Sequence, residues 1–387
     1  MSSYINIWNS FLYRLKRSVM IAIFLWIAIS PQTALTEETD ALYTDKNGVY
    51  KKDLVTNKHN TQYNLNGQQA IKNNQINLIP SSLIKSPKEN ASAILVEKNS
   101  QTLWVYRAIN GYFTKVLEIP CSTGEVDGPK MVEGDKKTPE GIYFLKDIYE
   151  DRFLTPIYGS RAFTTDYPNF LDKTLGKTGS AIWIHGTNKT LKPMDSNGCI
   201  AMNNDDIVKL DSYVVLDQTP VIIMDKFDYS SIERTDADRS AFMDFLSKWI
   251  ESLNKGSYLD YLFHYESNYM PDVQWWAEWV NIRYRAELSK NPIYAQFDNV
   301  GIYRHKDHFV VLLNFQVASS YRRIFIGNRK LFIKSINNVS SFYRYNSYKI
   351  IGDVFQSVQT KLSDKDSNHF IAAAYQLEEQ YREYKIK

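Results

Sequence analysis

Two neighbouring stretches of the sequence have the pattern of a buried strand followed by a reactive loop. They read Ile182-Trp183-Ile184-His185-Gly186-Thr187 and Ser196-Asn197-Gly198-Cys199-Ile200-Ala201-Met202. The apolar residues of the first stretch predict a buried strand, with a histidine where the strand ends. The second stretch places a cysteine among small residues, fourteen positions after that histidine. This arrangement suits nucleophilic catalysis by a cysteine and a histidine.

The residues around these stretches have the period and the turns of a mainly β domain. Strands are predicted over six ranges: 93–97, 102–108, 112–119, 141–148, 181–185 and 219–224. Apolar residues at helical spacing predict one helix over 204–216, with Asn203 or Asn204 as its N-cap. We therefore place a mainly β catalytic domain at residues 91–228.

A change of period near Asp236 predicts a second domain over residues 236–387. Apolar residues from Phe242 to Leu253 follow helical spacing. Two further helical stretches follow, one through Tyr258 to Tyr265 and one around Trp275 to Leu288. The remaining predicted elements are strands at 300–304, 308–315, 322–326, 331–336 and 342–351, and a closing helix at 370–384. Helices followed by an antiparallel sheet indicate an α+β domain.

The amino-terminal part of the sequence predicts export. Basic residues precede an apolar run from Val19 to Ile29, which is shorter than the roughly 20 residues that span a bilayer. Residues 1–36 are therefore expected to be a signal peptide or an uncleaved membrane anchor, which places the protein in the periplasm or cell envelope. Residues 37–90 are rich in Asn, Gln, Lys and Ser, and predict a tether with one or two short helices.

Charge and cysteine content exclude several classes of function. The 387 residues contain 46 basic and 43 acidic side chains, and a net charge of +3 gives no reason to expect nucleic acid as a partner. Two cysteines, Cys121 and Cys199, form neither a disulfide framework nor a four-cysteine zinc site. The histidines apart from His185 fall outside the catalytic domain: His59, His264, His305, His308 and His369. We expect no metal and no other cofactor.

The pairing of Cys199 with His185 favours catalysis over a purely structural role. An imidazole can hold a thiol as thiolate, and Gly198 lets backbone N–H groups approach a developing oxyanion. A main-chain carbonyl, such as that of Gly186, can fix the imidazole tautomer. The alternative is that both side chains are core residues, which is the usual role of a lone cysteine or histidine. Cys121 is expected to be a packing residue, although a disulfide with Cys199 would silence the site.

These motifs resemble the L,D-transpeptidase (YkuD-type) catalytic domain of bacterial cell-wall enzymes. The resemblance covers residues 91–225, and its specific part is His-Gly-Thr followed by Ser-x-Gly-Cys-Ile. It implies a β-sandwich-like fold with Cys199 as nucleophile, His185 as base, the Gly186 carbonyl as its orienting group, and the Gly198 and Cys199 amides as oxyanion hole. Many members have Arg where this chain has Ala201.

Further motifs resemble the members that trim murein stem peptides, which also tend to carry Ala in place of that Arg. These motifs are Tyr158-Gly159, Ala162-Phe163, Tyr167-Pro168-Asn169, Asp172 and Gly176-Lys177-Thr178-Gly179. The predicted substrate contacts are Trp183, Tyr158, Arg161, Asn169 and Ser196. Because residues 152–179 show little periodicity, they predict either a lid over the site or an ordered excursion.

The second domain resembles the cone-shaped nuclear transport factor 2-like fold. The combination of this fold with the catalytic domain resembles exported L,D-carboxypeptidases that shape helical bacteria. An aromatic group could line a pocket for a glycan or peptide, or could be core: Tyr261, Tyr265, Trp275, Trp276 and Trp279. Basic residues of this domain predict a solvated face that could meet anionic wall polymer.

The resemblance implies a peptidoglycan-modifying cysteine enzyme that attacks the L,D bond after meso-diaminopimelate in a tetrapeptide stem. Water as acceptor gives an L,D-carboxypeptidase, the favoured reading. An amine acceptor gives a transpeptidase that forms 3-3 cross-links or lipoprotein links. Two other interpretations remain open at this point: a non-catalytic wall-binding module, and a scaffold that dimerises through the second domain.

Overall fold

The computed structural model describes residues 78–269, 274–336, 348–357 and 371–377 of the chain. All of them belong to one compact unit that begins at Asn74. The expectations for residues 1–36 and 37–77 lie outside the described residues, as does most of the predicted closing helix. Within the described residues, no helix combines the length and the apolar character needed to cross a membrane.

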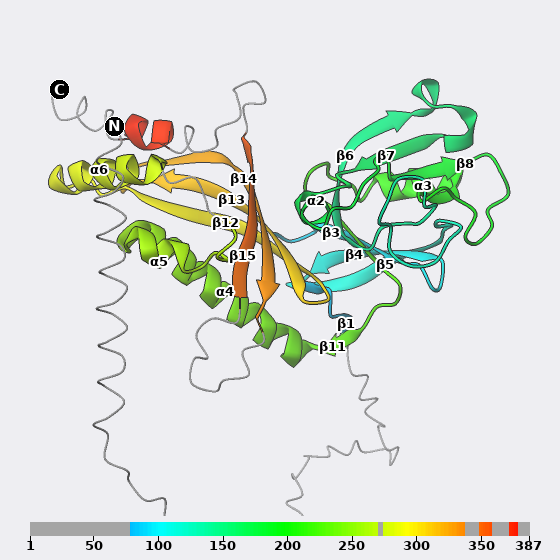
Figure 1. Ribbon diagram of the computed structural model, residues 1–387, viewed down its shortest axis with the longest axis horizontal. Coiled ribbons are helices and arrows are strands. Elements are labelled where there is room, and N and C mark those ends of the chain that lie inside the picture. Colours follow the sequence, from blue (N-terminus) through cyan, green and yellow to red (C-terminus); the bar gives the residue numbers. More distant parts are fainter. Residues whose placement is uncertain (1–77, 270–273, 337–347, 358–370, 378–387) are drawn as a thin grey trace, which may run out of the picture. The chain divides into compact units, whose positions relative to one another are not determined.

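A first lobe is built on eight strands, drawn from cyan to green in Figure 1. The strands are β3 (Ser92–Glu97), β4 (Thr102–Ile109), β5 (Tyr112–Pro120), β6 (Gly141–Glu150), β7 (Arg161–Thr165), β8 (Trp183–Thr187), β9 (Ile200–Asn203) and β10 (Pro220–Met224). Their order in the sheet is β5-β4-β3-β10-β6-β7-β8-β9. Each of the six strands predicted from the sequence is present, and β7 and β9 are additional.

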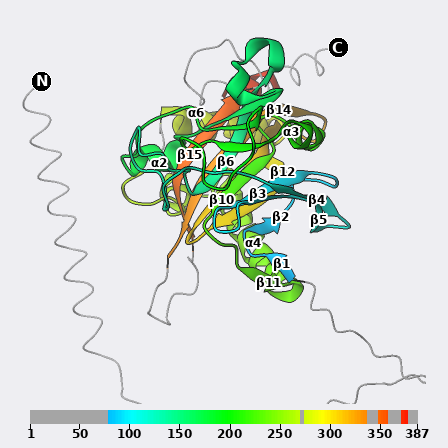
Figure 2. The same ribbon diagram turned by 90° about the vertical axis from the view of Figure 1, so that its right-hand side faces the viewer.

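This sheet curls until its two ends meet. Ser122, just after β5, exchanges backbone hydrogen bonds of 2.8 and 2.9 Å with Ala201 on β9. The central strands β3, β10 and β6 lie side by side (Figure 2). Their apolar side chains are buried because one face lines the inside of the curl and the other packs on neighbouring elements. This mostly β, curled sheet is compatible with the expected fold class of the first domain.

Short helices complete the first lobe. They are η1 (Asp151–Phe153), η2 (Pro156–Tyr158), α2 (Phe170–Thr174) and α3 (Asn204–Asp211). A capping box between Asn169 and Asp172 begins α2. Residues 152–179, considered above as a lid, therefore contain a sheet strand and a capped helix, and are an ordered part of the fold.

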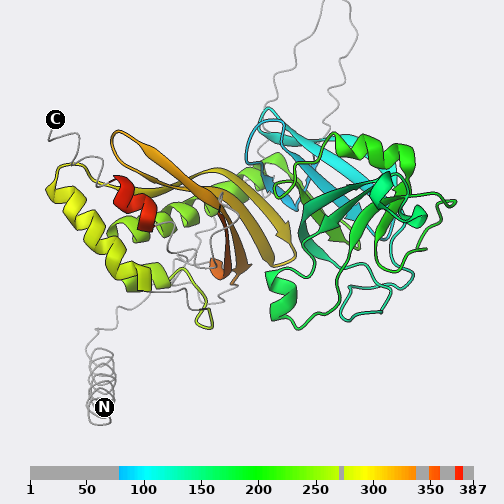
Figure 3. The same ribbon diagram turned by 90° about the horizontal axis from the view of Figure 1, so that it is seen from above.

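The second lobe consists of helices followed by a sheet, as the change of period predicted. The helices are α4 (Ile232–Lys255), α5 (Tyr258–Leu262) and α6 (Gln274–Leu288), and residues 371–377 are also helical. The strands are β12 (Tyr294–His305), β13 (His308–Ala318), β14 (Arg323–Ser335) and β15 (Tyr348–Ser357). In Figure 3 the helices lie against the yellow-to-orange sheet, and they share one apolar core with it.

The aromatic residues expected to line a pocket in this lobe mainly form its core. Tyr261, Tyr265 and Trp279 are at most 4% exposed and belong to the core between the helices and the sheet. Trp276 is partly buried against the same core. The side chain of Trp275 lies outside the described residues. Ring burial thus favours the core interpretation for these residues.

The second lobe also recruits a strand from before the catalytic domain. Residues 78–90, expected to be part of a tether, contain β1 (Leu78–Pro80) and β2 (Leu83–Lys85). Strand β2 pairs with β12, so the five-stranded order is β15-β14-β13-β12-β2. Strand β1 pairs with β11 (Tyr229–Ser231) just before α4. The ordered fold therefore begins before Ala91, where the sequence predicted it to begin.

Candidate active site

The parallel pairing of β8 with β9 places His185 and Cys199 on adjacent backbone segments. His185 is the register partner of Ala201 on β9. Cys199 directly precedes β9, two residues before Ala201.

The imidazole of His185 is oriented by the backbone of the next residue. Its Nδ1 lies 2.6 Å from the carbonyl oxygen of Gly186. Because a carbonyl oxygen can only accept a hydrogen bond, Nδ1 carries the proton and Nε2 is left as the basic nitrogen. Burial lowers the pKa of His185, and the bond to Gly186 acts in the opposite direction. The ring is therefore a neutral base at neutral pH.

Cys199 rests as a thiol. Its Sγ donates to the carbonyl oxygen of Ala181 over 3.5 Å. Burial raises the pKa of the Cys199 thiol, although the backbone N–H of Trp183 and the charge of Lys130 act in the opposite direction. A thiolate held by imidazolium, as considered from the sequence, is therefore disfavoured before substrate binds. A neutral thiol and a neutral imidazole are the states from which the sulfur can lose its proton to His185 as it attacks.

Gly198 is required by its conformation and its surroundings. Its φ is +117°, and a Cβ at this position would lie 2.7 Å from the carbonyl oxygen of Lys137. The Gly198 carbonyl accepts from the hydroxyl of Thr138 at 2.9 Å. Its amide donates to Ser196 Oγ at 3.1 Å, so this predicted oxyanion donor already has an acceptor. The role of the Cys199 amide stays a prediction.

Ser196 holds the catalytic loop together. Its hydroxyl donates to the carbonyl oxygen of Cys199 at 2.6 Å while it accepts from the Gly198 amide. These two bonds fold the loop around the cysteine, in the manner of a local side-chain turn. Ser196, predicted as a substrate contact, is therefore engaged within the loop.

Aromatic rings form a wall beside the histidine. Tyr158 lies edge-on to His185, with ring centroids 5.0 Å apart, and also contacts Trp183 at 5.0 Å. Tyr149 stacks on the other side of Trp183 at 5.7 Å and is 36% exposed. The predicted contacts Tyr158 and Trp183 thus lie together at the site. Tyr149, which the sequence analysis missed, extends this surface from the end of β6.

The side chains of the two other predicted substrate contacts, Arg161 and Asn169, form bonds to other residues of the first lobe. Arg161 forms an ion pair with Asp211 at the end of α3. Asn169 is buried: its side chain accepts from the Asp172 amide at 3.1 Å and donates to the Ile142 carbonyl at 3.0 Å. Both side chains stabilise the first lobe, and the structure does not bring Asn169 into contact with the Cys199–His185 pair.

The sequence analysis did not identify two residues that support the candidate site, Thr138 and Asn204. Thr138 is fully buried, and its hydroxyl bridges the Gly198 carbonyl and the Gly124 amide. Asn204, considered from the sequence only as an N-cap, accepts from the Ser160 amide at 2.9 Å. A Cβ added at Gly186 would lie only 2.3 Å from the Oδ1 of Asn204. Since both residues act through long-range contacts, no local motif marks them.

Cys121 has the environment of a packing residue. It is 3% exposed, and burial raises the pKa of its thiol to about 12. Cys121 and Cys199 are both free thiols. Among the described residues, no group of three or more histidine, cysteine, aspartate or glutamate side chains is arranged to hold a metal ion.

A curled β-sheet that carries a cysteine next to a carbonyl-oriented histidine is the framework of a cysteine-nucleophile acyl-transfer domain. The YkuD family model, described as the L,D-transpeptidase catalytic domain, matches residues 91–223. These residues therefore form a catalytic domain of that family, as the resemblance predicted.

Two solved structures are similar over most of the chain. Bd1075 from Bdellovibrio bacteriovorus has a TM-score of 0.60 and 27% identity, covering 74% of this chain and 100% of that one. The helical cell shape determining protein Pgp2 from Campylobacter jejuni has a TM-score of 0.54 and 25% identity, covering 71% of this chain and 95% of that one. Among curated proteins, no match to this chain is found.

Proposed function

We propose that this protein is an exported L,D-carboxypeptidase that trims tetrapeptide stems of peptidoglycan to tripeptides. The observation that carries the proposal is the oriented imidazole of His185, on the strand paired with β9, which Cys199 directly precedes. The family match of residues 91–223 supports peptidoglycan as substrate. Similarity to a protein named for helical cell shape supports a role in shaping the wall.

The first half of the proposed reaction forms a thioester. The Sγ proton of Cys199 passes to Nε2 of His185 while the sulfur attacks the carbonyl carbon between meso-diaminopimelate and D-alanine. The tetrahedral oxyanion is met by backbone amides, for which the Cys199 N–H is the candidate. The imidazolium then gives its proton to the departing amine, and D-alanine leaves.

The second half releases the tripeptide. Water attacks the thioester as Nε2 of His185 takes its proton, and the sulfur leaves and is reprotonated. The aromatic wall of Tyr149, Trp183 and Tyr158 offers an apolar platform beside the reacting atoms. We propose it as the surface on which the stem peptide lies. The acceptor is water because the subgroup motifs resemble hydrolytic members.

Product analysis tests the proposal. The full-length chain is incubated with purified disaccharide-tetrapeptide, and the products are identified by mass spectrometry. We expect disaccharide-tripeptide and free D-alanine, both absent with Cys199→Ala and both present with the matched thiol control Cys121→Ala. Cross-linked dimers would instead establish a transpeptidase. Absence of every Cys199-dependent product would favour the wall-binding module.

A further inference from the structure

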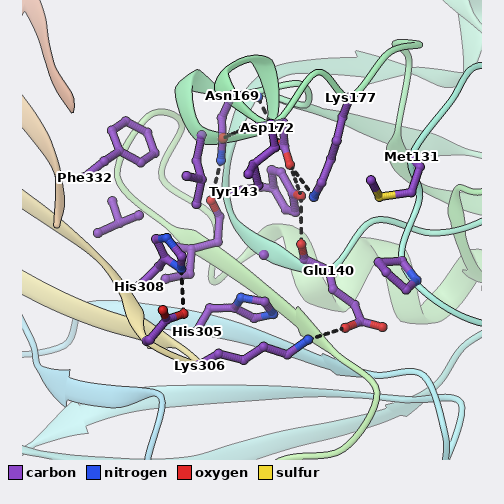
Figure 4. A pocket seen from close by; sticks show the side chains of 17 residues that line it. Met131, Glu140, Tyr143, Asn169, Asp172, Lys177, His305, Lys306, His308 and Phe332 are labelled. Carbon is purple, nitrogen blue, oxygen red and sulfur yellow. Dashed lines mark hydrogen bonds and ion pairs between the residues drawn. The ribbon is translucent and has the colours of Figure 1, made fainter. Parts of the chain in front are cut away.

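A cavity lies apart from Cys199 and His185, where the first lobe meets the turn between β12 and β13. Its volume is about 330 Å³, within the range of small-molecule sites. Figure 4 shows Lys306 of that turn paired with Glu140 of the first lobe, His305 and His308 beside the turn, and Asp172 pointing to Lys177. The cavity therefore combines charged groups from two parts of the chain that the sequence keeps far apart.

The body of the cavity is apolar. Ile142 and Leu171 of the first lobe line it together with Val310 and Phe332 of the second. Phe332 is 2% exposed and Val310 is 4% exposed, so these walls are fixed by packing in the core that both lobes share. A small apolar group would gain free energy by leaving water for such a surface.

The carboxylates at the cavity already have cationic partners. The two oxygens of Glu140 accept from Lys98 at 3.1 Å and from Lys306 at 3.3 Å. Asp172 pairs with Lys177 at 2.8 Å. The third lining carboxylate, Asp307, lies with its Oδ1 2.8 Å from Nδ1 of His308. An ammonium group has three N–H donors, so the bond to Glu140 leaves Lys306 able to meet a further acceptor.

His305 presents a polar atom to the cavity that lacks a partner. Its Nε2 is buried and has no hydrogen-bond partner among the described residues, a state that disfavours the folded protein unless a ligand or water supplies one. Burial, followed by the charge of Lys306, lowers the pKa of His305 to about 4. Lys177 and His308 lower the pKa further, and Glu140 alone of the groups named raises it. The ring is neutral at neutral pH.

We propose that this cavity binds a small monocarboxylate with an apolar body. The carboxylate accepts a hydrogen bond from Nε2 of His305 and is attracted by Lys306, while the aliphatic part lies against Val310 and Phe332. Both free amino acids and simple carboxylic acids have this chemistry. The site is distinct from the catalytic pair, although Glu140 lies two residues after Thr138, whose hydroxyl donates to Gly198 of the catalytic loop.

Histidine-selective NMR titration of the full-length chain tests the proposal. The probes are isocaproate, D-leucine and isohexanol, which share one branched carbon skeleton. We expect saturable shifts of the His305 signals with isocaproate and no saturable shift with isohexanol. D-leucine distinguishes the two sources: binding as tight as isocaproate points to free amino acids, and weaker binding points to simple acids. Equal binding of the alcohol, or no saturable shift by either carboxylate, would overturn the proposal.

Two variants localise the binding. His305→Leu removes the hydrogen-bond donor and should weaken the binding of isocaproate by about tenfold or more, as expected for loss of a charge-assisted hydrogen bond. The matched control is His264→Leu, since His264 also has a pKa lowered by burial but does not line the cavity. Isocaproate should also raise the pKa of His305 above its free value. Unchanged affinity in His305→Leu, or an unchanged His305 pKa on saturation, would contradict the assignment.

Discussion

His185 and Cys199 have pKa values that are shifted in opposite directions by the same cause. Burial disfavours the charged form of each group, so it lowers the pKa of the imidazole and raises that of the thiol. The resting pair is consequently neutral. Activation then depends on the carbonyl of Gly186, which keeps the proton on Nδ1 and leaves Nε2 ready to accept one.

Thiol alkylation should report this resting state. With iodoacetamide and no substrate, we expect the labelling rate of Cys199 to be lower at neutral pH than that of an ordinary exposed thiol. The rate should still be rising as the pH passes the ordinary thiol pKa, because the raised pKa delays thiolate formation. Site-resolved mass spectrometry separates Cys199 from Cys121. A rate that levels off below neutral pH would indicate a thiolate–imidazolium pair instead.

The acid side of the activity profile should follow His185. A base whose pKa is lowered stays deprotonated to lower pH, so kcat/KM should fall only as the pH passes below the ordinary value of 6.5. Activity is thus retained above the folded-state pKa and lost beneath it. The measurement is a pH profile of D-alanine release. A decline that begins above 6.5 would contradict the burial argument.

Gly198 should tolerate no side chain. Gly198→Ala would place a Cβ 2.7 Å from the carbonyl oxygen of Lys137, and the loop would have to shift around Cys199. A displacement of about 1 Å at a reacting group can reduce the rate by about 100-fold, which is the loss we expect in kcat. Gly134→Ala is the control, because its φ of +77° is strained but open space surrounds it. Similar kcat values for the two variants would contradict this role.

At the scale of elements, the catalytic loop is tied to the segment that leads into β6. Thr138→Val keeps the shape of the side chain but leaves the Gly198 carbonyl and the Gly124 amide without their shared partner. We expect a loss of about 1–3 kcal/mol in the free energy of unfolding, together with a lower kcat. Thr138→Ser retains the hydroxyl and should restore kcat. Urea unfolding and D-alanine release measure the two effects, and a stable, fully active Thr138→Val variant would refute the link.

The elements show why sequence patterns predicted only part of the fold. Six strands of the first lobe were predicted because they are apolar and bounded by turns. Strand β9 was missed because it is only four residues long, and β7 because only Ala162 and Phe163 of its five residues are apolar. The two strands predicted at 322–326 and 331–336 form one strand, β14. Its pairing with β13 shifts register between Phe325 and Gly327. Such an irregularity interrupts the period-two pattern.

The residues of the candidate site were also predicted only in part. Cys199, His185 and Gly186 could be predicted because the chemistry and the motif lie in short stretches of sequence. The contacts of Thr138 and Asn204 depend on how distant segments pack, and neither residue type signals such a role. Arg161 and Asn169 have the polar character of ligand-binding residues, yet both are engaged by partners within the first lobe.

At the scale of the whole molecule, the two lobes share buried residues. Leu95 and Phe144 of the first lobe belong to the same apolar cluster as Tyr303 and Phe332 of the second. The buried ammonium of Lys330 pairs with Asp166 at 2.9 Å and so links β14 to the first lobe. Domains at 91–228 and 236–387 stay a prediction, and the buried cluster between them was not foreseen because local patterns do not reveal a core formed between distant segments.

This shared core predicts cooperative unfolding. In urea, we expect near-ultraviolet circular dichroism and the NMR signals of His185 and His264 to change in one transition, since residues of both lobes form one buried cluster. A protein that consists only of residues 91–228 should accordingly be less stable than the same residues in the full chain. Two separate transitions would show that the lobes fold independently.

The most direct test of the account is to detect the covalent intermediate. The full-length chain is mixed with disaccharide-tetrapeptide, quenched in acid within the first turnovers and examined by intact-protein mass spectrometry with peptide mapping. We predict an adduct equal to the substrate without D-alanine, attached to Cys199 and absent from Cys199→Ala. Product formation without such an adduct, or an adduct on another residue, would contradict the proposed chemistry.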